Sequence, residues 1–386
     1  MQRWKSICRV ATLLASGVSM QATAAALGEP GGSGPWPATA ASTPALAQHT
    51  LYHPVQFPQQ PLPLYIWGNG ACRNDGLAHA AYLREIASRG YFVISLGAPR
   101  DAPTQAAPPA PAPPPGVTPD ETQPAQMLEA IEWATAENAR TGSAFHGRID
   151  LARIAVGGHS CGGLQALAVS HDPRIRTTLV LNSGIYVRPG GRSGVQIDKS
   201  QLDRLHGPLL YLTGGPEDIA HPNATDDVQR LHHLPVFFGA LPVGHGGTFA
   251  AADGGEWAQV SVRWLDWQLK TDADASWDFA GVECRLCVDD RWTIERRNLP
   301  APQGPRRESL YVPVRDGTRL AMNVYRPARD GVLRPGPLPV VFAFTPYRAR
   351  FRDAQGQLHE LESFPSPSSS LNTARCVSVP DAPGSR

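Results

Sequence analysis

From about residue 51 onward, short runs of apolar residues alternate with longer segments of helical character. The expected strands cover residues 64–67, 91–96, 154–156, 177–181, 209–213 and 235–241, and the expected helices cover residues 77–88, 125–138, 164–169 and 257–269. Strands that alternate with helices of about 10 to 15 residues pair in parallel, and the crossover helices bury both faces of the sheet. The alternation therefore predicts an α/β domain with a mostly parallel, doubly wound sheet.

Two stretches lack this alternation. Residues 27–48 are rich in Gly, Pro, Ala and Ser and have no apolar period, which predicts a flexible leader. Residues 102–115 contain too many prolines for a helix or a central strand, which predicts a loop. Because this loop follows a strand at the sheet edge where ligands bind, it either shapes the substrate entrance or is a solvated surface insert.

The N-terminus has the three parts of a secretory signal peptide. Basic residues precede an apolar run over residues 10–20, and the small residues at 22–26 fit a cleavage site. We predict a signal peptide over residues 1–26, a mature chain that begins near Ala25 or Leu27, and a secreted or periplasmic location; an uncleaved apolar helix is the alternative. No stretch is long and apolar enough to span a bilayer after cleavage.

The charge balance and the absence of cofactor motifs narrow the class of partner. The chain has 35 Lys and Arg against 34 Asp and Glu, so its sequence predicts no basic surface for nucleic acid. It contains no HExxH motif, no phosphate-binding P-loop and no dinucleotide glycine fingerprint. We therefore expect neither a metal nor an organic cofactor.

Residues 158–162 read Gly-His-Ser-Cys-Gly, a G-x-S-x-G nucleophile elbow. In such an elbow the serine sits on a sharp turn between a strand and a helix, and the flanking Gly158 and Gly162 leave room for the chain to pass. An apolar strand precedes the motif and a helix of small residues follows it, as the elbow requires. The motif predicts Ser160 as a nucleophile, while His159 is expected to pack or to point toward the pocket.

A serine nucleophile needs a histidine base and an acid that orients the base. In chains with this elbow the acid and then the histidine follow the serine, each beyond the end of a strand. His245 lies in a glycine-flanked loop after the last expected strand and is predicted as the general base. Asp218 is predicted as the acid, and Glu217, Asp226 and Asp227 are the alternatives.

An oxyanion hole in such proteins needs two backbone N–H groups. One comes from the residue after the nucleophile, here Cys161, and the other from a loop after an earlier strand. The glycine-rich loop after residues 64–67 offers Ala71 or Cys72. Cys72 and Cys161 would flank the same hole, where a disulfide would clamp its two halves if their Cα atoms lie within about 7 Å. Two buried free thiols are the alternative.

Export implies an oxidising compartment in which disulfides persist. Five cysteines follow the predicted signal peptide, namely Cys72, Cys161, Cys284, Cys287 and Cys376, so at least one stays free or pairs between chains. Cys284 and Cys287 form a C-x-x-C pair. One such pair has too few ligands for a structural zinc site and no thioredoxin-like unit surrounds it, which favours a local disulfide.

These motifs resemble those of exported bacterial α/β-hydrolases of the broad dienelactone-hydrolase and polyester-hydrolase type. The resemblance is carried by residues 67–72, 158–163, 244–248 and 264–270. It covers about residues 50–295 and implies an α/β-hydrolase catalytic domain over residues 49–295 with Ser160, Asp218 and His245 as a triad. Because the family acts on diverse substrates, the resemblance does not choose among them.

A second resemblance begins near Glu308. Residues 309–320 and 324–327, followed by Thr345-Pro346-Tyr347, look like the opening of a cocaine-esterase or X-Pro dipeptidyl-peptidase type hydrolase, in which a tyrosine matched by Tyr347 helps to form the oxyanion hole. No second elbow, acid and histidine follow. We therefore predict a truncated, β-rich module over residues 308–350 without its own catalysis, whose strands either add to the edge of the main domain or remain unpaired. Residues 351–386 have the composition of a disordered tail.

Taken together, the motifs predict a serine hydrolase that cleaves carboxylic esters, or related acyl bonds, through an acyl-enzyme on Ser160. The expected substrate is a small-molecule or polymeric ester. A prolyl-type peptidase, suggested only by the C-terminal segment, and a non-catalytic, degenerate α/β-hydrolase fold are the alternatives.

Overall fold

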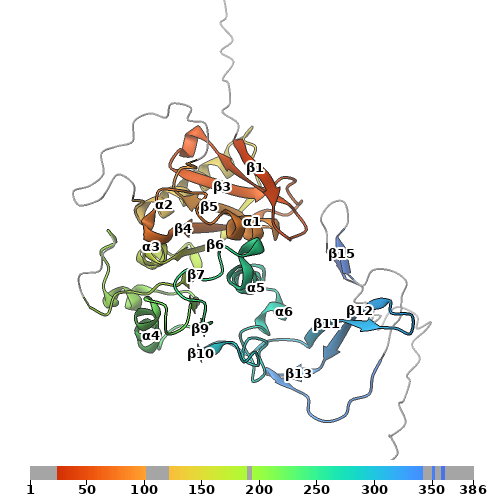
Figure 1. Cartoon of the computed structure of the whole chain (residues 1–386). Helices are drawn as coiled ribbons and strands as arrows, with labels where there is room; N and C mark the ends of the chain where they lie inside the picture. Colours follow the sequence, from red (N-terminus) through yellow and green to blue (C-terminus); the bar gives the residue numbers. More distant parts are fainter. Residues whose placement is uncertain (1–23, 101–120, 189–193, 342–349, 353–357, 361–386) are drawn as a thin grey trace, which may run out of the picture.

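A ten-stranded sheet forms the centre of the fold (Figure 1). The computed structural model describes residues 24–100, 121–188, 194–341, 350–352 and 358–360. In spatial order the strands are β1 (Ala25–Gly31), β2 (Ala38–Ser42), β3 (His49–Pro54), β5 (Phe92–Leu96), β4 (Leu62–Gly68), β6 (Ile149–His159), β7 (Ile175–Leu181), β8 (Leu209–Thr213), β9 (Val236–Ala240) and β10 (Thr293–Arg297). The neighbours from β5 to β9 in this order pair in parallel, and the flanking strands pair antiparallel. The predicted α/β class with a mostly parallel sheet is confirmed.

Helices pack on both faces of this sheet. They are α1 (Ala80–Ser88), α2 (Ala125–Ala139), α3 (Cys161–Val169), α4 (His221–Arg230), α5 (Gly255–Lys270) and the short α6 (Ala273–Ser276), with 3₁₀ turns η1 (Pro44–Leu46), η2 (Gly70–Cys72), η3 (Lys199–Arg204) and η4 (Ala252–Gly254). Helices α1 and α5 share one hydrophobic cluster with the sheet, and α2, α3 and α4 contribute to two others.

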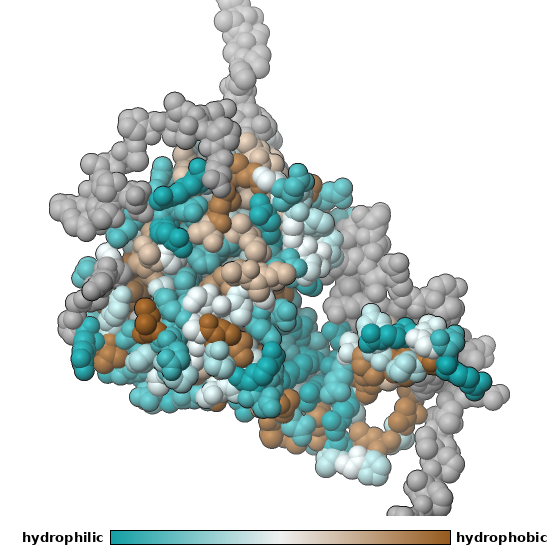
Figure 2. All heavy atoms as spheres, in the orientation of Figure 1, coloured by the Kyte–Doolittle hydropathy of each residue, from teal (hydrophilic) through white to brown (hydrophobic). Residues whose placement is uncertain are grey.

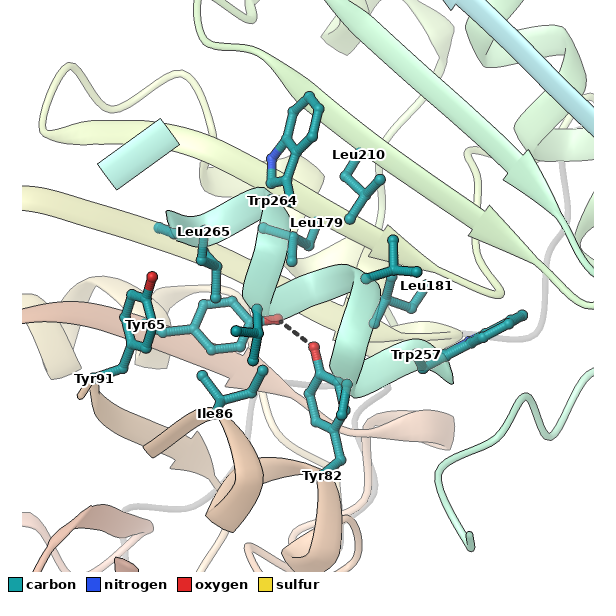
Figure 3. Packing of buried hydrophobic residues seen from close by; sticks show 14 of the residues in the cluster. Tyr65, Tyr82, Ile86, Tyr91, Leu179, Leu181, Leu210, Trp257, Trp264 and Leu265 are labelled. Carbon is teal, nitrogen blue, oxygen red and sulfur yellow. Dashed lines mark hydrogen bonds between the residues drawn. The ribbon is translucent and has the colours of Figure 1, made fainter. Parts of the chain in front are cut away.

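Strand β4 shows how the sequence pattern divides this core. Tyr65 and Trp67 belong to the cluster of α1 and α5, whereas Leu64 and Ile66 belong to the cluster of α2. Successive side chains of a strand point to opposite faces, so a strand covered on both faces is apolar at every position. Figure 3 shows the first cluster, in which Trp264 of α5 packs with leucines of the sheet.

The predicted flexible leader over residues 27–48 is wrong. This stretch contains most of β1, all of β2 and the turn η1, and β2 pairs with β3. Ala38 and Ala40 are fully buried, and Ser33 hydrogen bonds to the buried carboxylate of Glu85 on α1. Because these strands are rich in alanine and are held by backbone pairing, they carry no strong apolar period.

Helix α4 is not predicted by the sequence pattern. Its segment is mostly polar, and only Ala224 and Val228 reach a hydrophobic cluster. The helix forms because this narrow apolar side packs against the rest of the domain, together with the buried and hydrogen-bonded Asp227, while residues such as Gln229 and Arg230 face water. The helices and strands that the sequence pattern does predict form within a few residues of their expected bounds.

The C-terminal segment forms separate two-stranded sheets (Figure 1). They consist of β11 (Arg306–Pro313) with β12 (Arg319–Arg326), β13 (Ala328–Arg329) with β14 (Val332–Leu333), and β15 (Arg350–Arg352) with β16 (Leu358–Glu360). The described strands of the predicted truncated module therefore pair with one another and not with the main sheet. Exposed apolar side chains lie over β11, β12 and β14 (Figure 2), among them Tyr311 and Val332. The last strand pair lies at the start of the predicted disordered tail and corrects that prediction there.

Several predictions fall outside the described residues. They concern the signal peptide up to residue 23, the proline-rich loop at 102–115, Tyr347, Cys376 and the tail beyond residue 360. Within the described part of the chain, no helix is both long and apolar enough to cross a membrane.

Candidate active site

Ser160 occupies the turn between β6 and α3, at the carboxyl edge of the parallel strands. Its φ of 53° and ψ of −118° are unusual for a residue with a Cβ, and such backbone conformations cost about 1–3 kcal/mol. The surrounding backbone holds it there: the Ser160 N–H donates to the Leu181 carbonyl at 3.0 Å, and the Ser183 hydroxyl donates to the Ser160 carbonyl at 2.6 Å. The strain is maintained at the position predicted for the nucleophile.

The glycines around Ser160 are required by close packing. A Cβ at Gly158 would lie 2.2 Å from the carbonyl carbon of Gly162, and a Cβ at Gly162 would lie 2.0 Å from the carbonyl oxygen of Gly68. Both contacts are with backbone atoms, which cannot rotate away. Helix α3 therefore starts in direct contact with the end of β4, and this brings the loop after β4 next to Ser160.

The structure brings Ser160, His245 and Asp218 together from three strand ends. His245 Nε2 lies 3.0 Å from Ser160 Oγ, and His245 Nδ1 lies 2.6 Å from Asp218 Oδ1. The His245 side chain is 30% exposed, whereas the Asp218 side chain is fully buried. The alternatives to Asp218 lie elsewhere: Glu217 is exposed, and Asp226 and Asp227 form ion pairs with Lys199.

The buried carboxylate of Asp218 is surrounded by hydrogen-bond donors. Besides His245, it accepts from the Ala220 N–H at 2.9 Å, the Gly214 N–H at 2.9 Å and the Asn182 Nδ2 at 2.8 Å. Burial by itself raises the pKa of this carboxyl, but the hydrogen bonds from His245 and its other donors outweigh burial and lower the pKa to about 2. Asp218 is therefore ionised at neutral pH and accepts a hydrogen bond from the N–H at His245 Nδ1.

Asn182 is a site residue that the sequence analysis missed. Its Nδ2 donates to Asp218 and also to the Gly244 carbonyl at 3.2 Å, and its Oδ1 accepts from Trp257 Nε1 at 2.6 Å. It thereby ties the acid, the histidine loop and helix α5 together. The available signal was its position directly after β7, at the edge where the other site residues lie.

The glycine-rich loop after β4 is held by the buried side chain of Asn69. Its Oδ1 accepts from Trp67 Nε1 at 3.0 Å, and its Nδ2 donates to the Leu96 carbonyl at 2.7 Å. The Cys72 N–H donates to the Asn69 carbonyl at 3.1 Å, so this N–H is already used and Cys72 is not the second oxyanion donor. Of the two residues predicted in this loop, Ala71 remains.

Cys161 is the first residue of α3. The first N–H groups of a helix have no intrahelical acceptor, so the Cys161 N–H is available to a ligand beside Ser160. Anionic groups are favoured at this end of a helix. The prediction that Cys161 contributes an oxyanion donor is compatible with this placement.

Both predicted disulfide pairs are within bonding distance. Cys72 and Cys161 are linked with a Cα–Cα distance of 5.1 Å, and Cys284 and Cys287 with a distance of 4.9 Å. The first bridge joins the loop after β4 to the start of α3. Two cystine bridges are typical of proteins that fold in an oxidising compartment.

A small, open cleft of about 60 Å³ lies beside Ser160 and His245. Its rim includes Ile219 and Tyr186, which are 76% and 37% exposed. Its other lining residues are Cys161, Leu164, Asn182, Ser183, Gly184, Ala220 and Asn223. The lining thus combines apolar residues such as Leu164 and Ile219 with polar residues such as Asn223.

A scan of the sequence against protein-family models finds no match, and a search among curated proteins finds no similar sequence.

Proposed function

We propose that this protein is a serine hydrolase of the α/β-hydrolase fold. One observation carries the proposal: a single imidazole, His245, lies within hydrogen-bond distance of both the Ser160 hydroxyl and a buried, ionised carboxylate. This is the arrangement that nucleophilic catalysis by serine needs. More particularly, we propose that it cleaves carboxylic esters or related acyl bonds through an acyl-enzyme.

In the proposed mechanism His245 Nε2 takes the proton of the Ser160 hydroxyl while Oγ attacks the acyl carbon. Asp218 holds the imidazole in the required tautomer and stabilises the imidazolium that forms. The N–H groups of Cys161 and Ala71 stabilise the oxyanion. His245 then gives its proton to the leaving alcohol, activates a water that attacks the acyl-enzyme, and returns the proton to Ser160.

Labelling with a fluorophosphonate probe tests the proposal, because the reaction requires an activated serine. We expect labelling of the full mature chain, with the added mass on the peptide that contains Ser160. Heat-denatured protein is the control and should not react. An absence of labelling in the folded protein would favour the non-catalytic alternative.

The substrate class is tested with a panel of esters of graded acyl length, including aromatic and polymeric esters. The apolar rim of the cleft supports an apolar acyl or alcohol part, and its openness is compatible with either a small or a polymeric ester. An X-Pro amide in the same panel distinguishes the peptidase alternative. We expect ester hydrolysis to exceed amide hydrolysis.

The His159→Phe substitution tests how His245 is positioned. His159 Nε2 lies 3.0 Å from the His245 carbonyl, and burial lowers the pKa of His159 to about 4, so the neutral ring donates this hydrogen bond. Phenylalanine keeps a packed ring but cannot donate. We expect kcat to fall about tenfold, in line with the loss of a buried hydrogen bond, with a smaller change in KM.

The control for this substitution is His171→Phe, because the exposed His171 also contacts a backbone carbonyl but lies outside the site. Steady-state ester kinetics and circular dichroism are measured for both variants. Unchanged kcat in a folded His159→Phe protein would contradict the positioning role.

We also propose that the chain is exported and that the mature protein begins at Ala25. Strand β1 starts at this residue, and Ala25 and Ala26 pair with Ser42 and Ala41. Cleavage after Ala24 keeps both pairs, whereas cleavage after Ala26 removes them. N-terminal sequencing of the exported protein checks this: a start at Leu27, or retention of Met1, would contradict it.

A further inference from the structure

The Cys72–Cys161 disulfide joins the two backbone segments that flank Ser160. Cys161 directly follows Ser160, and Cys72 directly follows Ala71. The bridge therefore links Cys161, whose N–H is one proposed oxyanion donor, to Cys72, which is the neighbour of the other proposed donor, Ala71. The sulfur atoms take no part in the proposed chemistry, so the question is what the covalent link does.

The loop that contains Ala71 needs a restraint. Ala71 and Cys72 are consecutive residues with φ of 53° and 49°, in the left-handed region that residues with a Cβ seldom occupy. Such conformations persist only where the surrounding structure holds them. The loop is thus poised to relax if its restraints are removed, and relaxation would move the Ala71 N–H.

Hydrogen bonds between the described residues hold the loop to α3 only indirectly. The Cys72 carbonyl accepts from the Thr122 N–H at 2.7 Å, and Gln165 Nε2 of α3 donates to the Thr122 carbonyl at 2.7 Å. Asn69 ties the other side of the loop to the carbonyl of Leu96, the last residue of β5. Among the described residues, the disulfide is the covalent link between the loop and α3, which otherwise meet through the close backbone packing of Gly68 and Asn69 against Gly162.

We propose that the Cys72–Cys161 bridge is a positioning element that sets the spacing of the Ala71 and Cys161 N–H groups, so that hydrolysis depends on the oxidised state of this cysteine pair. The inference rests on the proposed function. Oxyanion donors act only at about 2.7–3.1 Å from the developing charge, and removing one lowers kcat by about 10²–10³-fold. Loosening one donor should cost less, about 10- to 100-fold in kcat. KM should change little, because these donors act mainly in the transition state.

A purely stabilising role must be separated from this one. The Cys72–Cys161 bridge spans 89 residues of sequence and the Cys284–Cys287 bridge spans 3, so the longer loop is expected to contribute more to stability in the chain-entropy description. A change in the unfolding temperature alone therefore does not test the proposal. The informative readout is kcat against KM at a temperature where every protein is folded.

The first experiment compares the double variant Cys72→Ala/Cys161→Ala with Cys284→Ala/Cys287→Ala in the full mature chain. Both keep every backbone N–H. We expect kcat for a short-chain aryl ester to fall 10- to 100-fold in the first variant and less than twofold in the second, with KM within about threefold in both. Wild-type kcat in a folded first variant would overturn the proposal.

A second experiment covers the case in which the first variant does not fold. In the Cys284→Ala/Cys287→Ala background, a water-soluble phosphine reduces the remaining bridge: the S–S bond breaks, phosphorus is oxidised to the phosphine oxide with oxygen from water, and two thiols form. Alkylation and peptide mass analysis measure the reduced fraction of Cys72 and Cys161, and circular dichroism monitors folding.

We expect the loss of kcat to follow the reduced fraction while the fold persists, and reoxidation to restore it. Activity that is independent of the reduced fraction would overturn the inference. Failure of the proposed function has a different signature, because the oxidised wild-type protein would then neither react with a fluorophosphonate nor hydrolyse any ester.

Discussion

Ser160→Ala should lower kcat for ester hydrolysis by a factor on the order of 10⁶, comparable with the loss when a triad serine is removed from a serine protease. The hydroxyl that His245 Nε2 contacts at 3.0 Å would be absent, so no acyl-enzyme could form. The alanine methyl fits the same strained turn, and the unfolding temperature should change little. The measurement is the burst and steady-state release of an aryl alcohol from an aryl ester.

The control for Ser160→Ala is Ser200→Ala, at an exposed serine of η3. We expect this variant to keep the wild-type rate. If Ser160→Ala retained the full rate and the burst, the proposed nucleophile would be refuted.

Asp218→Asn is expected to lower kcat by about 10⁴-fold, the size of the effect when a triad aspartate is replaced by asparagine in a serine protease. Each carboxylate oxygen of Asp218 accepts two hydrogen bonds. Oδ1 accepts from His245 and Ala220, and Oδ2 accepts from Asn182 and Gly214. The NH₂ group of the asparagine would replace one of these two oxygens, so it would face N–H donors and could not accept their hydrogen bonds. His245 would lose the partner that sets its tautomer, and the variant should also be less stable by about 1–3 kcal/mol.

The stability effect of Asp218→Asn has a defined pH dependence. The pKa of Asp218 is lowered from 3.8 to about 2 in the folded state, so the unfolded chain binds the proton more readily. The ionised Asp218 side chain therefore contributes about 2 kcal/mol to the free energy of unfolding. This contribution is fully present above pH 4 and is lost as the pH falls toward 2. Denaturant unfolding of both proteins over this range should show the wild-type advantage shrinking.

The surface variant Asp226→Asn is the matched control, because Asp226 pairs with Lys199 and Arg230 on the outside of α4. It should keep wild-type kcat. A folded Asp218→Asn protein with kcat near that of the wild type would mean that Asp218 does not orient the base.

Much of the fold could be predicted because its signals are local. Residues 209–212 of β8 are apolar at every position, since both faces of the strand are covered. The prediction of a flexible leader is wrong for the opposite reason: Ala38 and Ala40 are too small to produce a hydrophobic period, and their burial depends on strands and helices that follow later in the chain.

In the candidate site, too, some features are encoded in short segments and others depend on contacts between distant segments. The sequence determined the elbow around Ser160 and the order of acid and histidine, because glycine spacing and strand ends are encoded within short segments. Only the tertiary structure decided that Asp218 rather than Glu217 contacts His245, and that the Cys72 N–H is already used. It also revealed the role of Asn182. These features depend on which side chains and backbone groups meet across distant strand ends, and hydrogen bonds between distant segments leave no periodic trace in the sequence.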